Sequence, residues 1–423
     1  MRSALAVFAL SLTCLSAACA SAQPAQPAEQ TASRFTESPA HGGKLLLMHY
    51  MPWYQTPELR GYWGGHWTGW DAGHDPAQID AQGKPDIWSH YHPLIGTYDS
   101  ADPAVLECHL LQMKLAGVDG VIVDWYGILD AADYAPNQVA SVALFDACAK
   151  MGMGFAACYE DRTVEQAIKE GVLKQEQAGE HLAETFQWLQ EHWFSADHYV
   201  RYFGKPLLLC FGPIYLHDER VWQDALASTT DRPAFFPLHH LWPKIGGDGG
   251  FTWVHYNAWE GAKSSAQVRK NLQGVFDRTS QDPERVITSA VPGFRDVYKN
   301  PHPVLSHRNG VTLRETLGAA LAAESPVVQL VTWNDYGEGT MFEPTHEFGY
   351  LFLEILQDAR RAEIGAEAMP FTHDDLRLPA RLLELRKAGA VAQDKLDAIA
   401  DHLRDGRVAE ARAALDALAA ASH

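Results

Sequence analysis

Residues 102–125, DPAVLECHLLQMKLAGVDGVIVDW, contain a helix pattern followed at once by a strand pattern. In residues 102–116 the apolar side chains recur at three- and four-residue spacing, which predicts a helix with one buried side. Residues 118–125 form a short apolar run that ends in Asp124 and Trp125, which predicts a buried strand. A helix that leads directly into a buried strand is typical of α/β folds with a parallel sheet.

The same alternation of strand and helix extends along most of the chain. Eight apolar runs are predicted to be strands, at residues 44–50, 118–125, 154–160, 206–211, 234–238, 251–256, 286–291 and 327–333. Helical spacing recurs between them, for example at 139–151, 164–194 and 312–323. Eight nearly continuous apolar strands predict a closed (β/α)8 TIM barrel. An open doubly wound sheet is the alternative, and no GxGxxG follows the first strand to favour it.

The two ends of the chain differ in composition from this central part. Residues 1–22 combine Arg2, an apolar stretch and a small-residue end, which predicts a secretory signal peptide. Cys19 offers the alternative of a lipoprotein anchor, and either reading predicts export to the periplasm or the extracellular space. Residues 23–40 are predicted to be a flexible leader, 41–375 the barrel, and 376–423 a helical C-terminal extension.

Charge and composition limit the classes of partner. The 423 residues carry a formal net charge of −19, which argues against nucleic acid, and no run after residue 22 has the ~20 apolar residues of a membrane span. Cys108, Cys148, Cys158 and Cys210 lie in apolar contexts without CxxC spacing, so we expect buried thiols. None of the rim histidines His49, His66, His239 and His255 belongs to an HxH or HExxH motif, so we expect no catalytic metal and no cofactor, and a neutral glycan is the expected partner.

Aromatic and polar residues gather where the predicted strands end. In a parallel barrel the carboxyl ends of the strands and the loops after them form the functional rim. Tryptophan and tyrosine offer flat faces to sugar rings, and neighbouring polar groups bind hydroxyls, so the rim predicts a sugar cleft. Filling of the core is the alternative for any single aromatic residue, as is a structural ion pair for the run Glu160-Asp161-Arg162.

Asp335 and Glu338 are the predicted catalytic pair. They follow the last predicted strand, are three residues apart and are flanked by Gly337 and Gly339. Cleavage of a glycosidic bond usually needs two carboxyl groups, one of which stays protonated because burial or the second charge raises its pKa. A solvated turn is the alternative for this spacing alone, and the position after a barrel strand favours catalysis.

Several segments together resemble glycoside hydrolase family 99, which contains endo-α-mannosidases and endo-α-1,2-mannanases. Residues 91–103, YHPLIGTYDSADP, with the run through His109 and Met113 to residues 120–126, resemble the second-strand region of the family. Residues 333–340, WNDYGEGT, with Glu343, resemble its W-N-E-W-x-E-G-T element, and RNG at 308–310 and PGF at 292–294 are similar to further segments. The resemblance covers about residues 44–345 and is far more specific than any single motif.

The resemblance implies roles for the carboxyl pair. The first acid of the element, at Asp335, would act as a base on the sugar 2-hydroxyl, and the second, Glu338, as the acid that protonates the leaving group and later activates water, with retention of configuration. Asp335 replaces a glutamate, which shortens its reach by one methylene. The W-N-D form also resembles family 71, α-1,3-glucanases that use an inverting water, and a carbohydrate-binding barrel without turnover is the third alternative.

The predicted substrate-binding residues are Tyr50, Trp53, Tyr54, His66, Trp67, Asp124, Trp125, Tyr126, Glu160, Asp161, Arg162, His239, Tyr256, Arg308, Trp333, Asn334, Tyr336 and Glu343.

Overall fold

The computed structural model describes residues 34–254, 265–276, 282–298 and 304–421. The predicted signal peptide with Cys19, most of the predicted leader and the site residue Tyr256 lie outside these ranges. In the described part of the chain, none of the helices has the length and apolar character needed to cross a bilayer.

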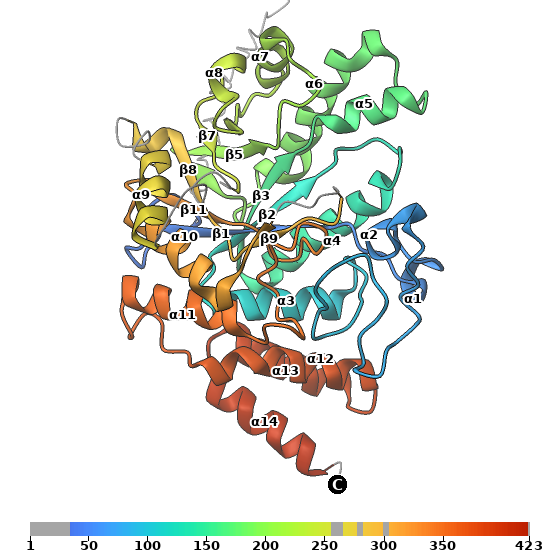
Figure 1. Ribbon diagram of the computed structural model, residues 1–423, viewed down its shortest axis with the longest axis vertical. Helices are drawn as coiled ribbons and strands as arrows, with labels where there is room; N and C mark the ends of the chain where they lie inside the picture. Colours follow the sequence, from blue (N-terminus) through green and yellow to red (C-terminus); the bar gives the residue numbers. More distant parts are fainter. Residues whose placement is uncertain (1–33, 255–264, 277–281, 299–303, 422–423) are drawn as a thin grey trace, which may run out of the picture. The chain divides into compact units, whose positions relative to one another are not determined.

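Eight parallel strands form the centre of the fold (Figure 1). They are β1 (Leu45–Tyr50), β2 (Gly120–Trp125), β3 (Gly154–Tyr159), β5 (Lys205–Cys210), β6 (Ala234–Pro237), β7 (Gly250–Phe251), β8 (Val286–Ala290) and β11 (Val327–Leu330). Each pairs in parallel with its neighbour along the chain, and β11 pairs back onto β1. A single bridge between Leu238 and Phe251 joins β6 to β7 and completes the ring. The prediction of a (β/α)8 barrel is confirmed.

The strands differ from the predicted runs at two places. Among the described residues of the run 251–256, only Phe251 belongs to a strand, as the end of β7 (Gly250–Phe251), and the run 327–333 ends as a strand at Leu330. Their remaining described residues belong to the loops at the functional rim instead. A short antiparallel β4 (Arg201–Tyr202) adds to β5, and β9 (Phe294–Arg295) pairs with β10 (Val304–Leu305) as a separate two-stranded ribbon.

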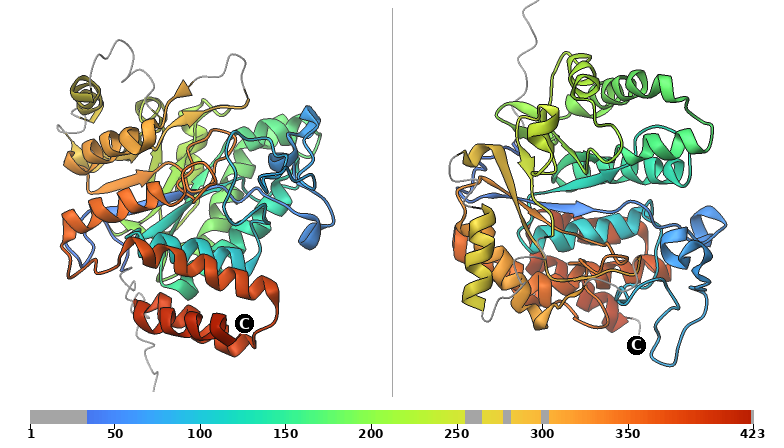
Figure 2. Two further views of the ribbon diagram at one scale, coloured as in Figure 1. Left: turned by 60° about the horizontal axis from the view of Figure 1, so that its bottom comes forward. Right: turned by 45° about the horizontal axis from the view of Figure 1, so that its top comes forward.

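Helices surround the strands on the outside, as the views in Figure 2 show. The prediction from residues 102–116 corresponds to α3, where Asp102 caps the helix by accepting a hydrogen bond from the Ala104 amide and Pro103 occupies the first turn. The helices are α1 (Pro57–Arg60), α2 (Gly65–Thr68), α3 (Pro103–Leu115), α4 (Tyr134–Met151), α5 (Arg162–Lys169), α6 (Ala178–Leu189), α7 (Glu219–Ala227), α8 (Trp242–Ile245), α9 (Ser265–Phe276), α10 (Val311–Ala322), α11 (Leu351–Ile364), α12 (Leu378–Ala388), α13 (Gln393–Arg404) and α14 (Val408–Ala421).

Alternation of side chains along each strand creates two apolar cores. Leu45 and Leu47 of β1 pack with Ile122 of β2 in the barrel interior. The residues between them in sequence, such as Leu46 and Met48, pack outward against the helices. Successive side chains of a strand point to opposite faces, so this parity decides which residues at a strand end can reach the space above the barrel.

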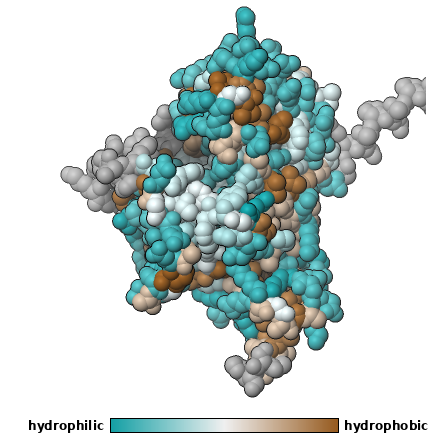
Figure 3. Space-filling model, turned by 90° about the vertical axis from the view of Figure 1, so that its right-hand side faces the viewer, coloured by the Kyte–Doolittle hydropathy of each residue, from teal (hydrophilic) through white to brown (hydrophobic). Residues whose placement is uncertain are grey.

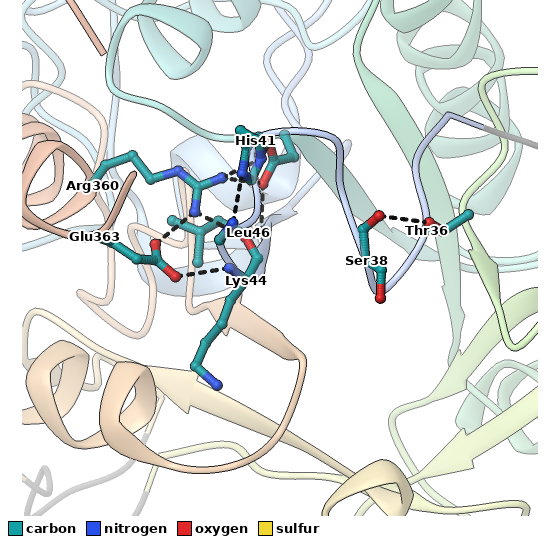
Figure 4. Close-up of polar contacts among 9 residues, drawn as sticks. Thr36, Ser38, His41, Lys44, Leu46, Arg360 and Glu363 are labelled. Atoms are coloured by element: carbon teal, nitrogen blue, oxygen red, sulfur yellow. Dashed lines mark hydrogen bonds and ion pairs between the residues drawn. The ribbon is translucent and has the colours of Figure 1, made fainter. Parts of the chain in front are cut away.

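The amino end of β1 is anchored by a charge network around the buried Arg360, drawn in Figure 4. Arg360 of α11 donates to the Lys44 carbonyl and to Glu363, and also forms an ion pair with Asp119 at 2.8 Å. Glu363 accepts the Lys44 amide, and Asp119 accepts the Leu46 amide. Because the Arg360 side chain is 1% exposed, these contacts fix the last helix of the barrel to its first strand.

The predicted C-terminal helices are present as α12, α13 and α14. Arg386 of α12 makes a two-pronged ion pair with Glu107 of α3, at 2.7 and 3.0 Å. Both side chains are less than a tenth exposed. Bidentate arginine–carboxylate pairing of this kind is directional, so it sets how α12 lies on α3.

Candidate active site

A cavity of about 520 Å³ lies at the carboxyl ends of the strands. The loop after β1, which carries α1 and α2, lies on this side of the barrel, on the right in Figure 1. Figure 3 faces the same side and shows hydrophilic surface interrupted by smaller hydrophobic patches. The cavity is lined by Met51, Trp53, His66, Asp124, Tyr126, Glu160, Arg162, Phe211, Ile214, Trp253, Phe294, Asp296, Tyr298, Asp335 and Glu338.

Eight of the predicted site residues therefore share one wall, the catalytic pair among them: Trp53, His66, Asp124, Tyr126, Glu160, Arg162, Asp335 and Glu338. They come from the ends of four strands that are far apart in the sequence and adjacent in the barrel. The rim predicted from strand ends is thus a real cavity, and it holds two features typical of sugar sites, acidic side chains and aromatic rings.

Asp335 is held by the turn that it starts. Its Oδ1 accepts a hydrogen bond from the Glu338 amide at 2.7 Å, and its own amide donates to the Thr332 hydroxyl. The side chain is 2% exposed. Burial, with the nearby Asp124 and Asp296 carboxyls, raises the pKa of Asp335 from 3.8 to about 7, although the Glu338 amide opposes this rise.

Glu338 combines access to the cavity with an unsatisfied oxygen. Its Oε2 is buried and has no hydrogen-bond partner. Burial and the neighbouring Asp335 raise the pKa of Glu338 well above its usual range, although the nearby Trp253 indole opposes this rise. A carboxyl group in this environment favours its neutral, protonated form, which is the form that a general acid needs.

The cavity as a whole is strongly acidic. Asp124, Glu160 and Asp296 join Asp335 and Glu338 in its wall, while Arg162 is the one lysine or arginine among the described lining residues. The pKa of Glu160 is raised well above its usual range by burial and by Asp124, and Arg162 opposes the rise. A cavity of this charge favours a ligand that carries or develops positive charge, and hydroxyl groups that donate hydrogen bonds.

Aromatic rings form the other part of the wall. The Trp53 and His66 rings stack at 4.0 Å with an interplanar angle of 3°. His66 also faces Asp133, 3.4 Å from its carboxylate. Tyr126 donates to Asp124 at 2.6 Å, which orients one carboxylate oxygen of that residue. These contacts hold flat apolar surface and acidic oxygens side by side.

A second group of predicted residues lies behind the wall rather than in it. Glu343 accepts hydrogen bonds from Tyr98 and Tyr336, and its other oxygen is 3.1 Å from His109. The side chain of Asn334 bonds to both backbone polar groups of Met51. This group, in which every side chain is at most 1% exposed, supports the loop that carries the catalytic pair: Tyr50, Tyr54, Trp67, Trp333, Asn334, Tyr336 and Glu343.

Strand parity and local pairing account for the remaining predicted residues. Trp125 follows Asp124 and so points outward, where its indole donates to Gln138. Asp161 accepts the amides of residues 214, 215 and 216 and so fixes the loop after β5. Arg308 pairs with Glu315 away from the cavity. His239 is half-buried at the end of β6 and does not line the cavity.

Seven lining residues were missed by the sequence prediction: Met51, Phe211, Ile214, Trp253, Phe294, Asp296 and Tyr298. Trp253 could have been found, because it follows the interior residue Phe251 by two positions. Asp296 and Tyr298 could not, because the backbone of 295–297 reaches the cavity by hydrogen bonds to the carbonyls of residues 337 and 338. The Tyr298 hydroxyl lies where a side chain at Gly337 would begin, which explains the glycine.

Comparison with known proteins shows which family the chain resembles. Residues 43–234 match the family model Glycosyl hydrolase family 99. The chain is a glycoside hydrolase similar to family 99. The matched range runs from β1 to the start of β6, so the family 99 model does not itself reach Asp335 and Glu338.

Individual relatives point to the same family. A glycoprotein endo-alpha-1,2-mannosidase-like protein of Danio rerio is 25% identical over 336 residues, which cover 70% of each chain. Glycoprotein endo-alpha-1,2-mannosidase of Mus musculus is 24% identical and covers 71% of this chain and 67% of its own. The fold is also that of the solved GH99 endo-alpha-mannosidase from Bacteroides thetaiotaomicron, with a TM-score of 0.56, 20% identity, and 75% and 98% of the two chains covered.

Proposed function

We propose that this glycoside hydrolase is an endo-acting α-mannosidase or α-mannanase in which Glu338 is the general acid and base and Asp335 acts on the sugar 2-hydroxyl. The observation that carries the proposal is the buried, unpartnered Oε2 of Glu338 in the cavity wall, next to Asp335. Relatives named as endo-mannosidases support the α-mannoside as substrate class.

In the first step, the Asp335 carboxylate removes the proton of the 2-hydroxyl while that oxygen attacks C1. The glycosidic bond breaks, and Glu338 gives its proton to the departing oxygen. In the second step, Glu338 takes a proton from water and the water oxygen attacks C1, while the bond between C1 and the 2-oxygen breaks and Asp335 returns its proton to that oxygen. The configuration at C1 is retained.

The two carboxyl groups must differ in protonation for this sequence to start. Asp335, with a pKa of about 7, is ionised above neutrality, and the pKa of Glu338 is raised further by that charge. Activity therefore requires a pH above about 7 for Asp335 and below the raised pKa of Glu338. The expected pH profile has its acidic limb near neutrality.

A second candidate mechanism is favoured by one contact. Because Oδ1 of Asp335 already accepts the Glu338 amide and the side chain is short, the carboxylate is drawn back toward its own turn. In that position Asp335 would activate a water molecule instead of the 2-hydroxyl, and the product would be inverted, as in a family 71-like α-1,3-glucanase.

The surroundings of the cavity support an extended glycan rather than a single sugar. Trp70 is 53% exposed, and its ring contacts His66, a residue of the cavity wall, with ring centroids 4.7 Å apart. Its other neighbour, Trp88, contacts the lining residue Tyr298 at 4.9 Å. An aromatic ring fixed beside the cavity offers a stacking surface for a sugar beyond the cleaved bond. Action outside the cytoplasm remains a proposal based on residues 1–22.

The test compares Glu338→Gln with the matched exposed control Glu180→Gln on α-mannan, on an α-1,3-glucan and on an aryl α-mannoside with a good leaving group. We expect E338Q to lose roughly 10²–10⁴-fold in kcat on the polysaccharide and much less on the activated aryl compound in its first step. Proton NMR of the first-formed anomer separates retention from inversion. Full activity of E338Q on every substrate would refute the role of Glu338.

A further inference from the structure

Three side chains of metal-ligand type meet inside the barrel, next to the cavity. His49, Asp124 and Cys158 come from the neighbouring strands β1, β2 and β3, one from each. Their ligand atoms all lie within 4.8 Å of one another, and all three residues are buried. Strand parity turns each of them inward, because Leu47, Ile122 and Ala156, two positions earlier, belong to the interior core.

His49 has an imidazole ring without a hydrogen-bond partner. The side chain is fully buried, and neither Nδ1 nor Nε2 is hydrogen-bonded. Nε2 points toward Asp124 but stays 3.6 Å from Oδ1, which is too long for a hydrogen bond. Leaving a buried polar atom unsatisfied costs about 1–3 kcal/mol. A ligand bound between the ring and the carboxylate would remove this cost.

The donor set fits a zinc-class ion. An imidazole nitrogen, a carboxylate oxygen and a thiolate sulfur are the three ligand types that zinc prefers, at about 2.0–2.3 Å, which puts ligand atoms of a tetrahedron roughly 3.3–3.7 Å apart. The 3.6 Å between Nε2 of His49 and Oδ1 of Asp124 is of this size. One aspartate and one thiolate would together balance the charge of a divalent ion.

We propose that His49, Asp124 and Cys158 bind one zinc-class divalent cation, with a water or a ligand hydroxyl as the fourth donor. On binding, the Cys158 thiol loses its proton to solvent and its sulfur joins the metal. The cation fixes Asp124, which also lines the acidic cavity, and offsets part of the repulsion among the carboxylates there. The proposal revises the expectation from sequence motifs that no metal is bound, and no step of glycoside cleavage depends on it.

The test measures metal directly on untagged protein. The protein is dialysed against a chelator, reloaded with Zn²⁺, freed of excess by gel filtration and analysed for metal, and in parallel it is loaded with Co²⁺. We expect about one zinc ion per chain, and a near-ultraviolet thiolate-to-cobalt charge-transfer band. Cys158→Ser should abolish the band and most of the bound zinc. Cys210→Ser, another buried strand thiol outside the cluster, should keep both.

Two outcomes would overturn the proposal. Folded wild-type protein that retains less than about a tenth of an equivalent of zinc lacks the site, and His49 then contacts protein groups such as Asp124 and the Trp253 ring without a metal. A cobalt spectrum without a thiolate band, or one unchanged in C158S, excludes Cys158 as a ligand. Neither readout needs activity, so they decide the metal site even if E338Q contradicts the proposed function.

Discussion

Replacing Asp335 by Asn tests the electrostatics of the site through protein stability. Burial in the folded chain raises the pKa of the Asp335 carboxyl from 3.8 to about 7. Each tenfold shift in proton affinity corresponds to about 1.4 kcal/mol, so the ionised form destabilises the folded state by roughly 4 kcal/mol. The carboxylate is 2% exposed, so solvent screens little of this effect.

The sign follows from proton binding. A group whose pKa is higher in the folded than in the unfolded state binds more protons when folded, so stability falls as the pH rises from 3.8 to about 7 and stays lower above it. The amide introduced by Asp335→Asn cannot ionise and keeps an oxygen for the Glu338 amide. We therefore expect the free energy of unfolding of D335N, relative to that of the wild type, to increase by about 2–3 kcal/mol when the pH is raised from about 5 to about 8.5. The variant should also lose activity.

The assay is urea unfolding followed by tryptophan fluorescence, at both pH values, with the exposed Asp394→Asn as control. The difference between variant and wild type cancels the titration of groups that the substitution leaves alone. A difference that is the same at both pH values, or that favours the wild type more at high pH, would refute the account of Asp335 as a carboxyl with a raised pKa.

Other predictions concern activity and anchoring. Arg360→Met should lower the free energy of unfolding, measured in urea, by about 1–3 kcal/mol, because it leaves the half-buried carboxylates of Asp119 and Glu363 without their buried cation; a loss below about 0.5 kcal/mol would contradict that role. Gly337→Ala should lower kcat by displacing the Tyr298 hydroxyl, and adding Tyr298→Ala to that variant should partly restore kcat. If the double variant is no more active than Gly337→Ala, the clash with Tyr298 is not the cause of the loss. Trp70→Ala should raise KM about 2–10-fold for long glycans and leave it unchanged for aryl glycosides, and equal effects on both would exclude stacking. Glu338→Gln should remove the alkaline limb of the pH–rate profile, because that limb reports the loss of the Glu338 proton. An alkaline limb that persists in the variant would show that another group is the acid.

Much of the site could be predicted from the sequence because barrel geometry sends strand ends to one rim. Asp124, Tyr126 and Glu160 lie at the ends of predicted strands and all reach the cavity. Trp125 of β2 and Tyr50 of β1 also lie at strand ends but point outward, because neighbouring residues of a strand face opposite sides. The prediction therefore located the strand ends but did not apply the parity that separates lining residues from supporting ones.

Local sequence determined the barrel and the pairing of Asp335 with Glu338 in one short turn, because periodicity and close spacing act over a few residues. Only the tertiary structure decided what surrounds that pair. Asp296 and Tyr298 arrive from a distant ribbon, and His49 meets Cys158 across two strand pairings. The pKa of a carboxyl group depends on its burial and on its distance from other charges, and metal ligands must lie within a few ångströms of one another. For groups remote in sequence, those distances exist only once the barrel has closed.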